Sequence, residues 1–196
     1  MLFSLTREDN SEQKISEYIS AVSRKLPLER FKHEAAYVNA FLGALEGTLE
    51  INKDKELEFR FIGTVVNDRG PNSAEKKFGA DFSLVFTDGK VEKAILSQAK
   101  NAPVTNLSKR EKQRLNEQCK KMDRHSSDWV VFEMPEKSGD IPTVCFLLDD
   151  GIKNMPIDEY ITTYVIGCTH GDRREEFVSS VTQSDLAGLE LVLRSR

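Results

Sequence analysis

The fold is decided by residues 78–100, FGADFSLVFTDGKVEKAILSQAK. Two apolar runs flank a turn that contains Asp88-Gly89, and this arrangement predicts a β-hairpin. Side chains alternate between the faces of a strand, so we expect Gln98 and Lys100 to point the same way, with Asp81 at the start of the preceding strand. Polar groups at half-buried positions cost several kcal/mol unless they are satisfied. A divalent cation with its water would satisfy these side chains.

Length and composition indicate one globular domain over residues 1–196. Hydrophobic residues make up 39% of the chain and charged residues 31%, a balance that excludes a disordered chain. No apolar run approaches the length of a membrane span, and the first residues lack the layout of a signal peptide. We therefore expect no membrane association.

Cysteine content and net charge restrict the cellular compartment and the kinds of binding partner that we expect. The three cysteines are widely spaced (Cys119, Cys145 and Cys168), which favours a reducing cytoplasm over a disulfide framework. The formal net charge is −4, so the field of the whole molecule does not attract nucleic acid. A polyanionic partner must therefore meet a local basic patch.

Two helices are expected before the hairpin. Residues 10 or 11 to about 26 fit a short amphipathic helix, and Pro27 suits the first turn of a second helix. Glu34 falls inside the apolar stripe of this second helix, and Gly43 and Gly47 continue its pattern. A carboxylate at this position either lies at the margin of the stripe and reaches water, or points into a site. The stripe consists of Phe31, Ala35, Val38, Phe41, Leu42 and Leu45.

Further strands and one long helix are expected on both sides of the hairpin. Residues 57–66, 129–132 and 143–148 are predicted strands, and residues 67–73 are dense in turn formers. The helix, from residue 106 or 108 to about 126, carries a strongly basic surface. A solvated face is the ordinary explanation of such a surface, but in an acidic protein it is also the best candidate for contacts with phosphate.

The tail of the chain gives weaker signals. Its patterns suggest a helical turn over residues 157–162, a short strand over residues 164–168, and a helix over residues 184–193 capped by Ser184 or Asp185. We expect residues 27–148 to form the core. Residues 149–196 are then a C-terminal extension of the same domain, with a role in oligomerisation or regulation.

The order of elements, with Asp81 and then Gln98-Ala99-Lys100, resembles the PD-(D/E)XK nuclease superfamily. The chain looks closest to small Gln-x-Lys nuclease domains of bacterial restriction and phage-defence systems. This closer likeness rests on AEKKFGADF at residues 74–82, on Gln98-Ala99-Lys100, and on Gln118-Cys119 with Met122. It covers about residues 30–148. The resemblance implies a restriction-endonuclease-like α/β fold, with a mixed central β-sheet flanked by helices.

Four residues carry the resemblance to the superfamily's site. Asp81 matches its metal-binding Asp, Gln98 the position usually held by Glu or Asp, Lys100 its catalytic Lys, and Glu34 its first-helix Glu. Two positions depart from the motif: Ala80 stands where it has Pro, and Gln98 where it has a carboxylate. The second departure lowers the negative charge and weakens the case for a tightly held second metal.

The resemblance implies a Mg²⁺-dependent (or Mn²⁺-dependent) endonuclease that hydrolyses DNA, with double-stranded DNA as the expected partner and defence as its setting. The metal ligands it implies are Asp81, Gln98, the Ala99 carbonyl and Glu34, all oxygen donors of the kind that Mg²⁺ prefers. Lys100 orients the attacking water or neutralises charge in the transition state. A homo-oligomer, or an activating protein or ligand, is a further expectation. The residues expected to contact nucleic acid are Lys109, Arg110, Arg114 and Lys77.

Two alternatives stay open on the sequence. The first is a catalytically inactive member of the fold that binds nucleic acid or protein, and the change to Gln98 favours it. The second is a plain α/β domain in which Asp81 caps or salt-bridges Lys100 for structural reasons alone.

Overall fold

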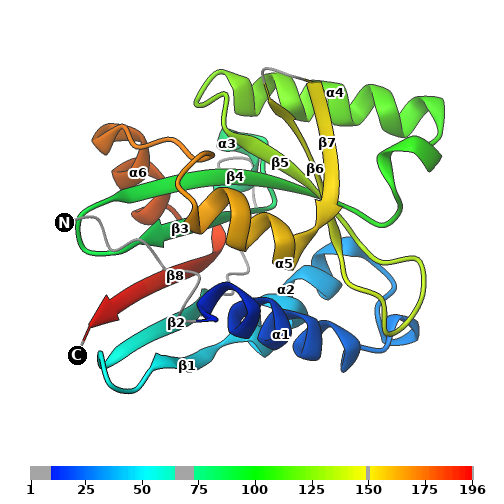
Figure 1. The fold of residues 1–196 in the computed structure, drawn as a ribbon. Helices are drawn as coiled ribbons and strands as arrows, with labels where there is room; N and C mark the ends of the chain where they lie inside the picture. Colours follow the sequence, from blue (N-terminus) through cyan, green and yellow to red (C-terminus); the bar gives the residue numbers. More distant parts are fainter. Residues whose placement is uncertain (1–9, 65–72, 149–150, 196) are drawn as a thin grey trace.

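The protein is α/β, with one mixed sheet flanked by helices (Figure 1). The computed structural model describes residues 10–64, 73–148 and 151–195. Over these residues the sheet has eight strands in the order β1-β2-β8-β3-β4-β5-β6-β7. Strand β8 is parallel to β3 and β4 is parallel to β5, whereas the other neighbours are antiparallel. The strands are β1 (Gly47–Asn52), β2 (Leu57–Thr64), β3 (Phe82–Thr87), β4 (Glu92–Lys100), β5 (Trp129–Glu133), β6 (Thr143–Leu148), β7 (Gly151–Pro156) and β8 (Ala187–Ser195).

The helices differ in length and type. The α-helices are α1 (Ser11–Arg24), α2 (Glu34–Leu45), α3 (Ala74–Phe78), α4 (Lys109–Asp123), α5 (Ile157–Tyr160) and α6 (Glu175–Thr182). Leu28–Arg30 and Val104–Asn106 are 3₁₀ turns, and Ile161–Ile166 continues α5 as a π-helix. The expected helices near residues 11–26 and 108–126 are confirmed as α1 and α4. Helix α4 begins where it does because Ser108 and Glu111 form a capping box.

The predicted hairpin is confirmed as β3 and β4, whose register runs from Phe82 opposite Ser97 to Thr87 opposite Glu92. The Asp88 carboxylate closes the turn, because its Oδ1 accepts hydrogen bonds from the backbone N–H groups of Lys90 and Val91 at 2.9 and 2.8 Å. This local chemistry fixes the pairing of the two strands.

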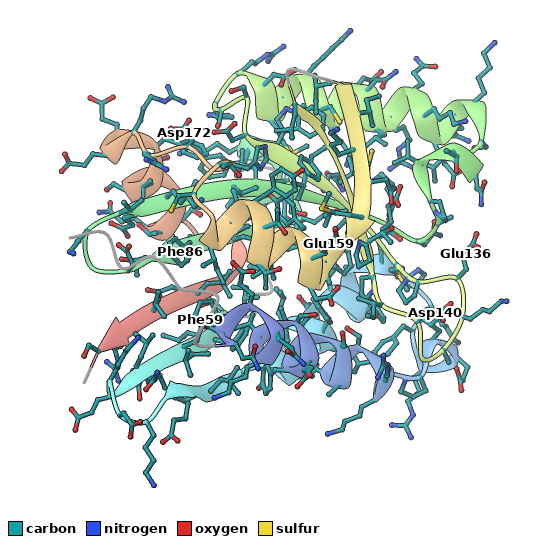
Figure 2. All side chains as sticks on the ribbon, in the orientation of Figure 1. Phe59, Phe86, Glu136, Asp140, Glu159 and Asp172 are labelled. Atoms are coloured by element: carbon teal, nitrogen blue, oxygen red, sulfur yellow. The ribbon has the colours of Figure 1, made fainter. Side chains whose placement is uncertain are left out.

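The two faces of the sheet pack against different helices. Phe82, Leu84 and Phe86 of β3 face the larger apolar layer, which α1, α2 and α5 complete. Figure 2 shows Phe59 and Phe86 in this layer. Val85 lies on the opposite face, in a smaller cluster with Ala94 and with side chains of α3, α4 and α6. Burial on both faces explains why β3 and β4 are almost continuously apolar.

The C-terminal tail lies in the middle of the sheet, which corrects the expectation of a core that ends at residue 148. Strand β8 lies between β2 and β3 and pairs with both along its length. The helix predicted over residues 184–193 is wrong, because Leu189, Leu191 and Leu193 are buried at every second position while Glu190 is exposed. That alternation has the period of a strand rather than a helix.

Other boundaries also need correction. Pro27 precedes a 3₁₀ turn, and α2 begins only at Glu34. The helical pattern does not continue through Gly47, which begins β1. The strand expected over residues 164–168 is wrong, because π-helix and turn occupy these positions. Strand β7 and helix α6 were not expected. The predicted strand over residues 57–66 is confirmed as far as Thr64. Residues 65–72, which include the end of that predicted strand and most of the loop expected after it, lie outside the described residues.

The central position of β8 predicts a large stability cost for Leu191→Ala. Leu191 is 0% exposed and lies between Phe61 of β2 and Phe86 of β3. We expect a loss of about 2–5 kcal/mol in the free energy of unfolding, measured by urea denaturation. Glu190→Ala, at an exposed position of the same strand, is the matched control and should cost less than about 1 kcal/mol. Equal effects of the two substitutions would contradict a buried central β8.

Candidate active site

Asp81, Gln98 and Lys100 come together, as the hairpin pattern predicted. The register that pairs Phe82 with Ser97 places Asp81 level with Gln98 at the open end of the hairpin. Asp81 Oδ2 accepts hydrogen bonds from the Ala99 N–H at 2.7 Å and from Gln98 Nε2. The Asp81 N–H donates to the Ser97 carbonyl at 2.8 Å, so backbone contacts hold this residue from two sides.

Lys100 is fixed by two uncharged oxygen acceptors. Its Nζ donates to the Ala99 carbonyl at 2.8 Å and to Gln118 Oε1 of α4 at 3.2 Å. The residue is only 9% exposed, and burial lowers the pKa of its ammonium group while the nearby Asp81 and Glu34 raise it. Gln118 was part of the family resemblance but had no assigned role, because its spacing in the sequence does not show which strand its helix crosses.

Burial raises the pKa of the Asp81 carboxyl to about 6. The Ala99 N–H and the Lys100 charge oppose this rise, whereas Glu75 and Glu34 add to it. Ionisation of the Asp81 carboxyl in this buried position therefore costs free energy. A site of this kind favours the approach of a positive charge.

Glu34 lies at the edge of this group. It is the first residue of α2 and is partly exposed, so it is not embedded in an apolar stripe as the sequence suggested; Tyr37 takes the buried position instead. Its charge acts on both Asp81 and Lys100. Within the described part of the chain, no hydrogen bond joins Glu34 to either of them. Glu34 therefore acts on the site through its charge.

The oxygen donors at the centre fit a hard divalent cation. Gln98 is 2% exposed, and its Oε1 is buried without a hydrogen-bond partner while its Nε2 donates to Asp81. A half turn of this amide would bring Oε1 beside the Asp81 carboxylate, an arrangement that a cation between the two oxygens would stabilise. No group of three or more His, Cys, Asp or Glu side chains suited to a metal occurs among the described residues. A metal would therefore depend on the amide and carbonyl oxygens as well as on Asp81.

The predicted basic residues lie at different distances from the centre. Lys109, Arg110 and Arg114 are exposed on α4, which runs across the top of the view in Figure 1. Of these, Arg114 is close enough to lower the pKa of Lys100 by its charge. Lys77 is exposed on α3, with Nζ 4.9 Å from the centre of the Phe78 ring. Arg114 is therefore the basic residue of α4 that the structure ties to the site.

A groove adjoins the site. Its lining includes Lys32 and His33, which directly precede Glu34, and Asn101, which directly follows Lys100. Phe31 and Met134 supply apolar surface to the same groove. Glu136, which also lines it, extends from the loop after β5 in Figure 2. The groove therefore lies between the segment that precedes α2 and the segment that follows β4.

Gly79 sets the distance between α4 and the Asp81 segment. It ends α3 with a left-handed φ of 76°. A Cβ at this position would lie 2.6 Å from Lys121 Cβ and 3.0 Å from the Gln118 carbonyl oxygen. The glycine thus allows α4 to approach closely enough for Gln118 to reach Lys100.

Comparison with known proteins gives no relative for this chain: no family model, curated protein or solved structure matches it. Within the described residues, no helix is both long enough and apolar enough to span a membrane.

The packing at Gly79 predicts that Gly79→Ala destabilises the protein more than Gly89→Ala. Both glycines have positive φ, 76° and 80°, so both substitutions cost about 1 kcal/mol in backbone strain. Only Gly79 faces a crowded neighbour, whereas a Cβ on Gly89 meets nothing within 4 Å. We expect Gly79→Ala to cost at least about 1 kcal/mol more in urea unfolding. Equal costs would mean that α4 does not press on this segment.

The raised pKa of Asp81 predicts how Asp81→Asn changes stability with pH. The folded-state pKa of about 6 lies above the value of about 4 in the unfolded chain, so ionisation disfavours the folded state. The wild type therefore loses stability relative to Asp81→Asn as pH rises from about 4 to about 7, by up to about 3 kcal/mol. Urea unfolding of both proteins across this range measures the difference. Asp54→Asn, at an exposed turn, is the matched control for the loss of one carboxylate. A difference that shrinks as pH rises would contradict the assignment.

Proposed function

We propose that the chain is a metal-dependent nuclease of the restriction-endonuclease-like class that hydrolyses phosphodiester bonds in DNA. The observation that carries the proposal is the meeting of Asp81, Gln98 and Lys100 at one end of the β3–β4 hairpin, beside a groove. An acid of raised pKa, an amide with an unsatisfied oxygen and a buried lysine are unusual neighbours. Packing alone gives no reason to place them together.

Asp81, the Gln98 amide oxygen and the Ala99 carbonyl are the groups that would hold Mg²⁺ or Mn²⁺, with Glu34 adding negative charge nearby. When bound, such an ion acidifies a water and polarises a phosphate oxygen. The protein's own contribution is to hold these oxygens in place through the β3–β4 register and the bond from Ala99 N–H to Asp81.

Lys100 is the group that meets the phosphate. An ammonium has three N–H donors, and Nζ uses two of them on Ala99 and Gln118. The third serves a phosphate oxygen, where a fixed positive charge stabilises the negative charge that develops during hydrolysis. Gln118 positions the Lys100 ammonium and does not itself contact the substrate.

DNA would follow the groove and the nearby basic side chains. Arg114 is near Lys100, and Lys109 and Arg110 extend the positive surface along α4. These contacts bind the phosphate backbone and give no specificity for base sequence. In an acidic protein they supply the local patch that binding requires.

A catalytically inactive, binding-only module of the same fold is the second candidate. The orientation of Gln98 favours it, because an amide that donates to Asp81 satisfies the carboxylate without a metal. The two candidate functions differ in one observable. A nuclease cleaves DNA and needs Lys100 and the metal to do so, whereas a binding module binds without cleavage.

Supercoiled plasmid tests the proposal directly. With Mg²⁺ or Mn²⁺ we expect nicking or linearisation on agarose gels, abolished by EDTA. Lys100→Ala should lose at least about 10²-fold in rate, because a fixed charge at the transition state is removed. Lys90→Ala, in the exposed turn at the far end of the same hairpin, should keep full activity.

Metal binding has a readout that does not depend on cleavage. Mg²⁺ at about ten times its Kd stabilises the folded state by about 1.4 kcal/mol. The resulting rise in Tm should disappear in Asp81→Asn and persist in Lys100→Ala. Gln98→Glu should retain metal binding if the Gln98 oxygen is a ligand. Binding of plasmid without cleavage, and no metal-dependent rise in Tm, would overturn the nuclease and support the binding module.

A further inference from the structure

A second cavity lies at the start of β5, whereas Lys100 is level with the end of that strand. It is lined by the end of α4, the start of β5, the end of β6, the first residue of β7 and the loop after the π-helix. Its polar members include Asp123, Asp128 and His170, and its apolar members include Trp129 and Leu147. The proposed nuclease chemistry uses none of these residues.

His170 is the most deeply buried of the polar residues that line this cavity. Its side chain is 3% exposed, and Nδ1 lies 2.6 Å from the Tyr160 hydroxyl. Its Nε2 is buried with no hydrogen-bond partner and lies 3.7 Å from Asp128 Oδ1, beyond hydrogen-bond distance. Burial lowers the pKa of His170, so the ring is neutral at neutral pH and does not cancel the Asp128 charge. A buried nitrogen without a partner beside a partly exposed carboxylate indicates that a further group belongs there.

The charge of the lining is negative. Asp123 and Asp128 contribute two carboxylates, and none of the described lining residues is Lys or Arg. Two cations act on Asp128 from outside the lining, but both are engaged elsewhere. Lys93 is 0% exposed and donates to the His170 carbonyl at 2.6 Å, and Arg174 is paired with Asp172. The cavity therefore suits a positively charged group that enters from solvent.

An exposed apolar surface continues from the cavity to the edge of the sheet. The register that pairs Val131 with Cys145 brings Trp129 level with Leu147, and Leu147 is paired with Ile152 of the edge strand β7. Leu147 is 60% exposed and Ile152 is 75% exposed, and they are the large hydrophobic side chains that the described surface exposes most openly. An apolar patch next to an acidic cavity is typical of a protein-binding surface.

We propose that this surface binds a segment of a partner protein in which a basic residue is flanked by apolar residues. The basic side chain enters the cavity at Asp128 and Asp123, and the flanking residues cover Leu147 and Ile152. The cavity is too poor in clustered ligands for a metal, since the described residues contain no group of three metal-ligating side chains. The two carboxylates repel nucleic acid.

Trp129 allows a direct test, because it is the single tryptophan of the chain and lines the cavity. The probe is the peptide acetyl-Ser-Leu-Arg-Leu-Ser-amide, titrated against the full-length protein with Trp fluorescence and calorimetry. Its comparator carries citrulline, a neutral isostere, in place of arginine. We expect saturable binding of the arginine peptide, at least tenfold tighter than the citrulline peptide.

Three variants locate the site. Asp128→Asn should weaken binding of the arginine peptide by about tenfold, and Ile152→Ser, a surface change, should weaken both peptides severalfold. Asp54→Asn removes an exposed carboxylate in the β1–β2 turn, at the other edge of the sheet, and should bind as the wild type does. Circular dichroism confirms that each variant is folded.

Three results would overturn the proposal. They are the absence of both a fluorescence change and a heat signal with the arginine peptide, equal affinity for the arginine and citrulline peptides, and unchanged affinity in both Asp128→Asn and Ile152→Ser. Saturable quenching of Trp129 by a single-stranded oligonucleotide, with none by the peptides, would assign the cavity to nucleic acid instead.

Discussion

The hydrogen bond from the Ala99 N–H to the Asp81 carboxylate, 2.7 Å long, ties the start of β3 to the end of β4. It exists because the turn at Asp88 fixes the register of the hairpin, and a shift of one residue would turn Gln98 and Lys100 to the other face. The same bond stabilises an ionised Asp81 against the cost of burial. The position of the acid, the amide and the lysine thus follows from one strand pairing.

Much of this hairpin and its polar end could be predicted from the sequence, because the signals are local. The Asp88-Gly89 turn and the two apolar runs give the strands, and their alternation places Gln98 and Lys100 on one side. Glu34 was expected near the site and does act on its charges, although its helix begins later than the stripe suggested. The nuclease function itself stays a proposal, since it rests on residue types and their arrangement.

Long-range pairing could not be predicted in the same way. Strand β8 is parallel to β3 in the sheet, although more than 80 residues separate the two strands in the sequence. No local sequence pattern indicates which strands β8 pairs with. Its leucine-rich sequence also fits a helix until the alternation of Leu189, Glu190 and Leu191 is given full weight. Gln118 escaped assignment for a related reason. A helix pattern shows which residues are buried but not which side chain of another element they meet.

Helix α4 is the element that the two proposed sites share. Gln118 holds Lys100 at one site, and Asp123, five residues later, accepts a hydrogen bond from Trp129 Nε1 at the other. Five residues correspond to about 7.5 Å along a helix, a length over which a hydrogen-bonded helix moves as one body. The capping box at Ser108 fixes the start of α4, and the close approach to Gly79 fixes its position near Gln118 and Lys121. Asp123 and Gln118 therefore belong to one helix that contacts both proposed sites. This gives the two proposed sites a physical link that neither residue pattern showed.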